Sequence, residues 1–163
     1  MIHVLLVPRG WIIICSFLVG LLLTVMPLPD WLVAARPEWL AMFVIYWTLA
    51  LPTLVGITTA WCLGLLLDVL RDGLLGQHAL TFVMISFLCI RFHQRIRLYP
   101  LQQQAFIVLI LILLEQLVLL WINGFSGQPP TTWVYWLPAF TSALLWPFFF
   151  IIMREIGGRV RSH

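Results

Sequence analysis

The sequence contains no lysine, and only 9% of its 163 residues are charged, whereas 63% are hydrophobic. A soluble domain carries roughly 25% charged residues, because its surface must be hydrated. No hydrophilic segment is long enough for a soluble domain, and the longest polar stretches, 91–104 and 123–132, are expected to be loops. These absences exclude an ordinary water-soluble protein. They indicate a single domain, residues 1–163, that folds in lipid.

Motifs of the common catalytic and metal sites are also absent. There is no GxSxG, P-loop or GxGxxG, and the histidines, which fall at the termini and in expected loops, show no HxxxH or HExxH spacing. Cys15, Cys62 and Cys89 lie singly inside apolar runs without a CxxC pair, which predicts small buried hydrophobic residues. We therefore expect no catalytic residues, no metal and no cofactor. The net charge of +3 comes from arginines beside apolar runs, a topology signal rather than a nucleic-acid-binding surface.

The apolar runs predict an all-α, polytopic membrane protein with about six transmembrane helices. A helix that crosses a core of ~30 Å needs about 20 residues. The apolar stretch 39–70 would extend to about 48 Å as one helix. Pro52 and Gly56 near its middle predict a break, because proline removes a helical hydrogen bond. The expected spans are 11–28, 38–51, 53–70, 74–92, 102–122 and 133–153.

The arginines predict orientation but do not settle the number of spans. With six spans and a cytoplasmic N-terminus, only Arg36 and Arg71 lie outside, and five spans with an external N-terminus also leave two arginines outside. Both arrangements place loop 91–101 and the C-terminus in the cytoplasm, and the length argument favours six spans. The cytoplasmic basic cluster Arg91, Arg95 and Arg97 is either a topology signal or a contact with anionic lipid or a cytoplasmic partner.

Gly56, Ala60 and Gly64 form a stripe of small residues at four-residue spacing. Small residues let helix backbones approach closely in lipid, so the stripe predicts helix packing or a partner contact. Asp68 and Arg71 extend it. Because Asp68 lies near a span end, we expect it to pair with Arg71 or to cap a neighbouring helix. A proton or cation site is the alternative.

Glu115 is the most deeply placed acid, near the centre of 102–122 with Gln116 beside it. No second acid or histidine shares its helix face. We expect a buried polar contact between helices, with Glu115 either protonated or accepting hydrogen bonds from Thr141 or Ser142. A transport ligand site is the alternative.

An ordered series of short motifs resembles one known family. The motifs are Pro27-Leu28-Pro29-Asp30, Arg36-Pro37-Glu38-Trp39, Tyr46-Trp47, Leu49-Ala50-Leu51-Pro52, Gly64-Leu65-Leu66-Leu67-Asp68, Gly76, Leu145-Trp146-Pro147 and Met153-Arg154. Together they resemble the MreD family of bacterial rod shape-determining membrane proteins over nearly the whole chain. The stretch 101–135 matches mainly in hydropathy.

The resemblance implies a six-helix fold similar to the substrate-binding subunits of vitamin-uptake (energy-coupling factor) transporters. It also implies a non-catalytic role in the bacterial cytoplasmic (inner) membrane. Members work with the bitopic protein MreC, alongside the actin-like MreB, the glycosyltransferase RodA and the elongation transpeptidase. Together these direct peptidoglycan insertion along the side wall. Membrane lipids are expected as further partners, and nucleic acid is not.

A second hypothesis is a small-molecule binding subunit of a membrane transporter. A polar, water-filled central cavity would favour that hypothesis. A closed apolar core with a small-residue groove facing lipid would favour a subunit of the elongation machinery.

Overall fold

The computed structural model describes residues 2–27, 29, 36–52, 55–71, 75–125, 127 and 133–161, with only the backbone described for 2–10, 133–134 and 157–161. This part of the chain contains α-helices and one short 3₁₀-helix, and no strand. The elements are α1 (Ile2–Val25), α3 (Trp39–Ala50), α4 (Ile57–Leu70), α5 (Gln77–Leu98), α6 (Leu101–Phe125), η1 (Trp133–Trp136) and α7 (Leu137–Arg161). The predicted all-α class is therefore confirmed.

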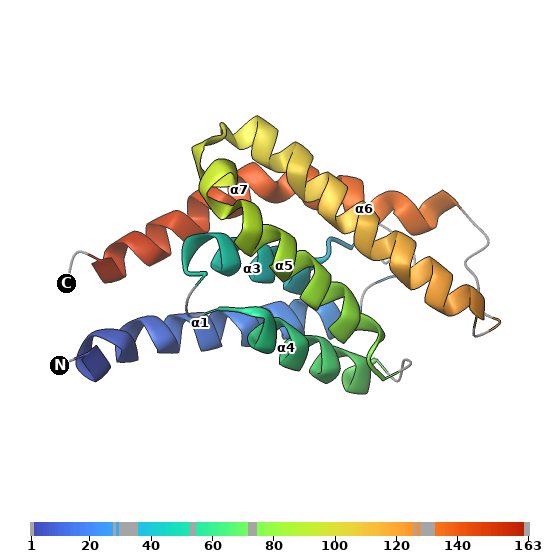
Figure 1. Ribbon diagram of the computed structural model, residues 1–163, viewed down its shortest axis with the longest axis horizontal. Helices are drawn as coiled ribbons and strands as arrows, with labels where there is room; N and C mark the ends of the chain where they lie inside the picture. The colour runs from blue at the N-terminus through green and yellow to red at the C-terminus, as the bar shows by residue number, and fades with distance from the viewer. Residues whose placement is uncertain are drawn as a thin grey trace.

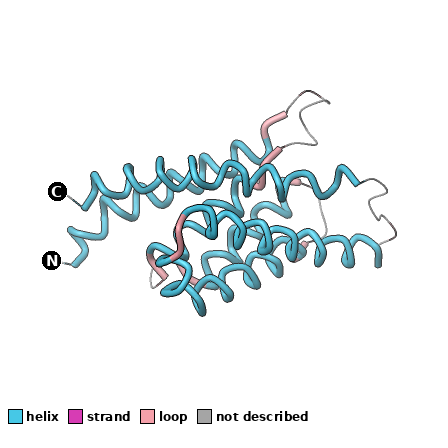
Figure 2. The backbone as a smooth tube through the Cα atoms, turned by 90° about the horizontal axis from the view of Figure 1, so that it is seen from above, coloured by secondary structure: helices cyan, strands magenta, loops and turns pink. Residues whose placement is uncertain are grey.

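The helices run back and forth along one long axis. The start of α1 and the end of α7 lie at the same end of the bundle in both backbone views (Figure 1, Figure 2). The turn between α5 and α6 lies toward that end, whereas α4 ends and α5 begins at the opposite end (Figure 1). We call these the terminal end and the far end.

Helix α3 forms the centre of the bundle. All of its residues from Leu40 to Leu49 are buried, and it packs on α1, α5, α6 and α7. A helix that is apolar all round belongs inside a protein, so its composition matches its position. Its 12 residues extend about 18 Å, short of a ~30 Å hydrocarbon core. Because its neighbours cover it, α3 does not have to match the bilayer itself.

The outer surface of the bundle is apolar. Leu144 is 75% exposed and Phe148 66% exposed on α7, and Trp121 on α6 is 62% exposed. Such a surface is suited to lipid rather than water. The same surface corrects the prediction for two cysteines, since Cys15 and Cys62 are exposed and Cys89 alone is buried. An apolar run predicts an apolar environment, but in lipid that environment lies outside the bundle as well as inside.

Within the described residues, three helices can cross a membrane by length and composition: Gln77–Leu98, Leu101–Phe125 and Leu137–Ile156. The segments Trp11–Val25, Trp39–Ala50 and Ile57–Leu70 are apolar but shorter. Pro52 lies in the break between α3 and α4. Whether the chain crosses a bilayer six times stays a prediction.

The segment 91–104 is not the loop that its polarity predicted. Helix α5 continues to Leu98 and α6 begins at Leu101, so only Tyr99 and Pro100 connect them. Arginine and glutamine are good helix formers, and their polarity carries no information about where a helix ends. Proline cannot continue a helix but fits the start of the next one, which places the turn at Pro100.

Candidate functional site

The small-residue stripe divides in the structure. A Cβ atom added to Gly64 would lie 2.4 Å from Ala79 Cα and 2.5 Å from Ala79 N, so α4 and α5 meet backbone to backbone there. Ala60 is fully buried. Gly56 instead precedes α4 as its N-cap, and a Cβ there would meet nothing within 4 Å. The close contact at Gly64 is therefore internal to the chain, and Gly56 takes no part in it.

Asp68 caps the N-terminus of α5. Its Oδ2 accepts a hydrogen bond of 2.8 Å from the Gly76 N–H, and its Oδ1 accepts one of 3.1 Å from the His78 N–H. The first amides of a helix lack partners within the helix, and a carboxylate satisfies them well. Gly76 makes the turn possible, because its φ of 100° lies in the left-handed region that favours glycine.

The side-chain partner of Asp68 is His78, whose Nδ1 lies 2.7 Å from Asp68 Oδ1. Of the two sequence expectations for Asp68, capping matches this geometry, and Arg71 forms no ion pair with it in the described part of the chain. His78 was expected in a loop, but it is buried in the first turn of α5. The acid ten residues earlier gave no local signal of this pairing, since the two meet only across the α4–α5 turn.

Three arginines bind carbonyl oxygens at the C-terminal ends of helices. Arg36 donates to Thr24 O and Met26 O at the end of α1, and Arg71 Nη2 lies 3.4 Å from Thr24 O. Arg97 Nε donates to Leu49 O at 2.6 Å, and its Nη2 donates to Ala50 O, at the end of α3. The last carbonyls of a helix are unpaired and carry partial negative charge, so a guanidinium stabilises them.

This use of arginine divides the expected basic cluster. All three side chains are exposed, but the guanidinium of Arg97 binds carbonyl oxygens at the end of α3. Arg91 and Arg95 therefore keep more of their hydrogen-bonding capacity for lipid or a partner.

Glu115 has an exposed fraction of 0%, and neither carboxyl oxygen has a hydrogen-bond partner in the part of the chain that the structure describes. Thr141 Oγ1 instead donates to Leu137 O at 3.0 Å, and Ser142 Oγ accepts the Glu38 N–H at 2.9 Å. The expectation that Thr141 or Ser142 bonds to Glu115 is therefore wrong. Hydropathy placed all three residues in adjacent spans but could not give their relative rotation.

Gln116, the neighbour of Glu115, ties α6 to the chain just before α7. Its Nε2 donates to Tyr135 O at 3.1 Å, and the Tyr135 hydroxyl donates to Gln116 O at 2.7 Å. Gln116 Oε1 is buried and, among the described residues, unpartnered. The region around Glu115 and Gln116 therefore holds three buried side-chain oxygens that accept no hydrogen bond from the described residues, namely both carboxyl oxygens of Glu115 and Gln116 Oε1.

Charged groups gather around Glu115, and we call Arg36, Glu38, Arg71, Glu115 and Tyr135 the polar cluster. Glu115 interacts electrostatically with Glu38 and Arg71, and Tyr135 interacts with Glu115 and Glu38. Burial, and then the positive charge of Arg71, lower the pKa of Arg36, while Glu38 opposes that shift. These residues come from segments far apart in the sequence, so only the fold brings them together.

A second link joins α5, α6 and α7 near the terminal end. Gln104 Nε2 donates to Ile96 O at 3.0 Å and to Tyr99 O at 3.2 Å, and Gln104 Oε1 accepts from Trp146 Nε1 at 3.3 Å. Sequence reasoning did not single out Gln104. Its signal was a glutamine at the start of an apolar run, where free carbonyls of the preceding helix lie close by.

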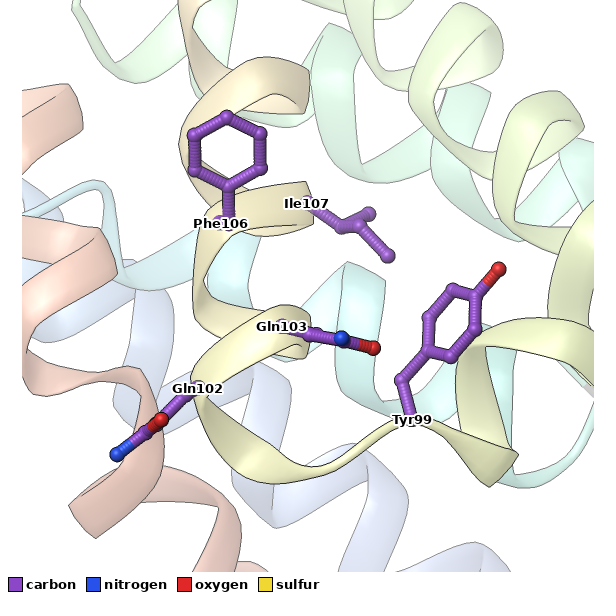
Figure 3. A pocket seen from close by; sticks show the side chains of 5 residues that line it. All are labelled: Tyr99, Gln102, Gln103, Phe106 and Ile107. Carbon is purple, nitrogen blue, oxygen red and sulfur yellow. The ribbon is translucent and has the colours of Figure 1, made fainter.

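Two open grooves lie at the ends of α6. One, of about 410 Å³, is lined by Tyr99, Gln102, Gln103, Phe106 and Ile107 (Figure 3). The other, of about 490 Å³, is lined by Leu120, Trp121, Gly124 and Phe125. Neither groove includes Asp68 or Glu115. Among the described residues, no three His, Cys, Asp or Glu side chains lie together as a metal site would require.

The described part of the chain is an all-helical bundle with an apolar exterior. Three of its helices are long enough to cross a bilayer, and buried polar groups cap its own helices. These features define a class: the polytopic α-helical membrane proteins. Comparison with known proteins then identifies the family. The family model for rod shape-determining protein MreD matches residues 7–156. The rod shape-determining protein MreD of Haemophilus influenzae is 32% identical over 157 residues, which cover 94% of this chain and 95% of that protein. No solved structure gives a significant match. The chain belongs to the MreD family of rod shape-determining membrane proteins.

Proposed function

We propose that this chain is a non-catalytic membrane subunit of the bacterial cell-wall elongation machinery. It resides in the cytoplasmic (inner) membrane, maintains rod shape and helps direct side-wall peptidoglycan synthesis. The observation that carries this proposal is the family match across residues 7–156. The uses of the polar side chains support it, because Asp68, Arg36 and Arg97 are bound to backbone groups of the chain itself. Residues committed in this way hold helices in place rather than act on a substrate.

The partners that this role requires are other membrane proteins of the same machinery. We propose MreC as the direct partner, with RodA, the elongation transpeptidase and MreB reached directly or through the complex. Exposed apolar side chains on α4, among them Trp61 and Val69, and Leu144 on α7 supply a surface on which lipid or transmembrane helices of partners can pack. Arg91 and Arg95 supply positive charge for anionic lipid headgroups.

Complementation tests the role in shape. The chain is expressed in a rod-shaped bacterium depleted of its own family member, with insertion checked by its level in the membrane fraction. We expect rods to be restored and MreC to co-purify from the native membrane. Cells that stay round, although the inserted protein is present at the normal level, would overturn the proposal.

The second candidate, a small-molecule binding subunit of a transporter, is supported by the unpartnered carboxyl of Glu115. Against it, the described core is built from apolar side chains such as Phe82, Ile112 and Trp146. Mass spectrometry of small molecules released from the purified chain separates the two. A stoichiometric organic compound that is lost in Glu115→Gln would favour the transporter subunit.

A further inference from the structure

We propose that Glu115 is a proton-binding site: the folded chain holds it as a neutral carboxylic acid inside the helix bundle. The inference does not depend on the role in cell shape. It starts from a comparison of two acids in the same chain.

Asp68 and Glu115 are both buried, with exposed fractions of 1% and 0%, but only Asp68 has donors. Asp68 accepts from two backbone amides and from the His78 ring. Glu115 accepts from nothing in the described part of the chain. A buried carboxylate without donors or a counter-ion costs far more free energy than its neutral acid, and a group so placed binds a proton instead.

Three side chains of this region already donate to other acceptors. The Tyr135 hydroxyl donates to Gln116 O, Gln116 Nε2 donates to Tyr135 O, and Arg36 donates to Thr24 O and Met26 O. Arg36 Nε is buried without a partner among the described residues, but turning Arg36, Tyr135 or Gln116 toward Glu115 would break one of these hydrogen bonds. Binding a proton removes the charge without such a loss.

Charged and titratable groups of three other segments of the described chain interact electrostatically with Glu115. Glu38 precedes α3, Arg71 follows α4 and Tyr135 lies in η1. The negative charge of Glu38 opposes a second carboxylate, and the positive charge of Arg71 favours one. Arg71 itself is exposed and Glu38 is partly exposed, so the charged groups that interact with Glu115 lie nearer the surface than its carboxyl.

Release of the proton to water would leave a buried negative charge, and Arg71 is the positive charge that interacts with it. Arg71 has one long contact, 3.4 Å to Thr24 O, which links the ends of α4 and α1.

Infrared spectroscopy of the chain in a detergent without ester carbonyl groups tests the proposal. A neutral carboxylic acid has a carbonyl-stretch band separate from the amide bands, whereas a carboxylate lacks it. We expect the band at neutral pH in the wild type and in the matched control Glu155→Gln, which changes an exposed acid near the end of α7. It should be absent in Glu115→Gln, shift in D₂O and disappear from the wild type at high pH. A wild type without the band at neutral pH, or a Glu115→Gln protein that keeps it, would overturn the proposal.

Labelling covers the case in which Glu115→Gln does not fold. The chain has three glutamates, Glu38, Glu115 and Glu155. With ¹³C-labelled glutamate, a band that shifts in the wild type and survives in both Glu38→Gln and Glu155→Gln belongs to Glu115 and supports the proposal. A band that does not shift, or that is lost in either variant, would overturn it.

Discussion

At the residue scale, Asp68 shows how a buried acid is satisfied when its donors come from the next helix. Its two oxygens bind the Gly76 and His78 amides and the His78 ring. The acid thereby fixes where α5 begins relative to α4. A role of this kind is structural, and it separates Asp68 from Glu115, which has no donors.

The Asp68→Asn protein should remain folded and largely support rod growth. The asparagine oxygen can accept from the backbone amides, and its NH₂ can donate to His78 Nδ1 if the imidazole takes its other tautomer. We expect a loss of about 1 kcal/mol, because bonds to a neutral group are weaker than bonds to a charged one. Asp68→Ala should lose about 3 kcal/mol, since it leaves buried donors unpaired. Thermal unfolding in detergent and cell shape measure the two effects.

A different outcome would assign Asp68 another role. If Asp68→Asn abolished rod growth while the protein level and complex assembly stayed normal, the carboxylate itself would be required. That result would revive a proton or ligand site at Asp68.

At the scale of elements, the packing of α4 on α5 depends on the absence of a side chain at Gly64. Gly64→Ala should destabilise the chain by about 1–3 kcal/mol, although alanine is the better helix former, because the added Cβ would meet the Ala79 backbone at 2.4 Å. Gly124→Ala is the matched control in α6, where a Cβ meets nothing within 4 Å, and it should change stability by no more than about 0.5 kcal/mol.

Gly64→Leu should be worse than Gly64→Ala, because a larger side chain must push α5 further away. Protein level in the membrane, unfolding temperature and recovery of partners measure this. A Gly64→Leu protein with wild-type level, partner recovery and cell shape would show that the close contact does not matter to the fold or to its function.

Arg97 links α5 to α3, because its guanidinium binds carbonyl oxygens at the end of α3. Arg97→Gln removes a guanidinium that bonds to Leu49 O and Ala50 O, and we expect a loss of about 1 kcal/mol. Arg91→Gln removes an exposed arginine from the same helix and should leave stability unchanged. The unfolding midpoints of the two variants, measured in the same detergent, test whether Arg97 stabilises the fold. Equal midpoints would mean that Arg97 is only a topology signal.

At the scale of the whole molecule, α1 begins and α7 ends at the same end of the bundle (Figure 1). A chain that crosses the membrane an even number of times has both termini on the same side. We predict that reporter fusions after His3 and after His163 both report the cytoplasm, and that a fusion after Gly127, between α6 and α7, reports the opposite side. An N-terminal reporter on the outside would exclude the six-span arrangement and restore the five-span one.

Some properties of this protein could be predicted from sequence because they are local or additive. Scarcity of charge and long apolar runs require helices in lipid, whatever their mutual placement. Pro52 predicts a helix break from the chemistry of a single residue. The ordered motifs, read along the chain, were enough to indicate the family.

Other properties were decided only by the tertiary structure, because they depend on how helices rotate against one another. The sequence left open whether Asp68 pairs with Arg71 or caps a helix, and the α4–α5 turn brings it to the amides of Gly76 and His78. Cys62 and Cys89 both lie in apolar runs, yet one faces outward and the other inward. Thr141, Ser142 and Glu115 lie on adjacent helices, but α7 is rotated against α6 so that Thr141 bonds to Leu137 O and Ser142 to the Glu38 N–H. The side of a membrane helix that faces lipid and the side that faces the protein are both apolar. Hydropathy therefore cannot specify how the helix is rotated, whereas side-chain packing and hydrogen bonding can.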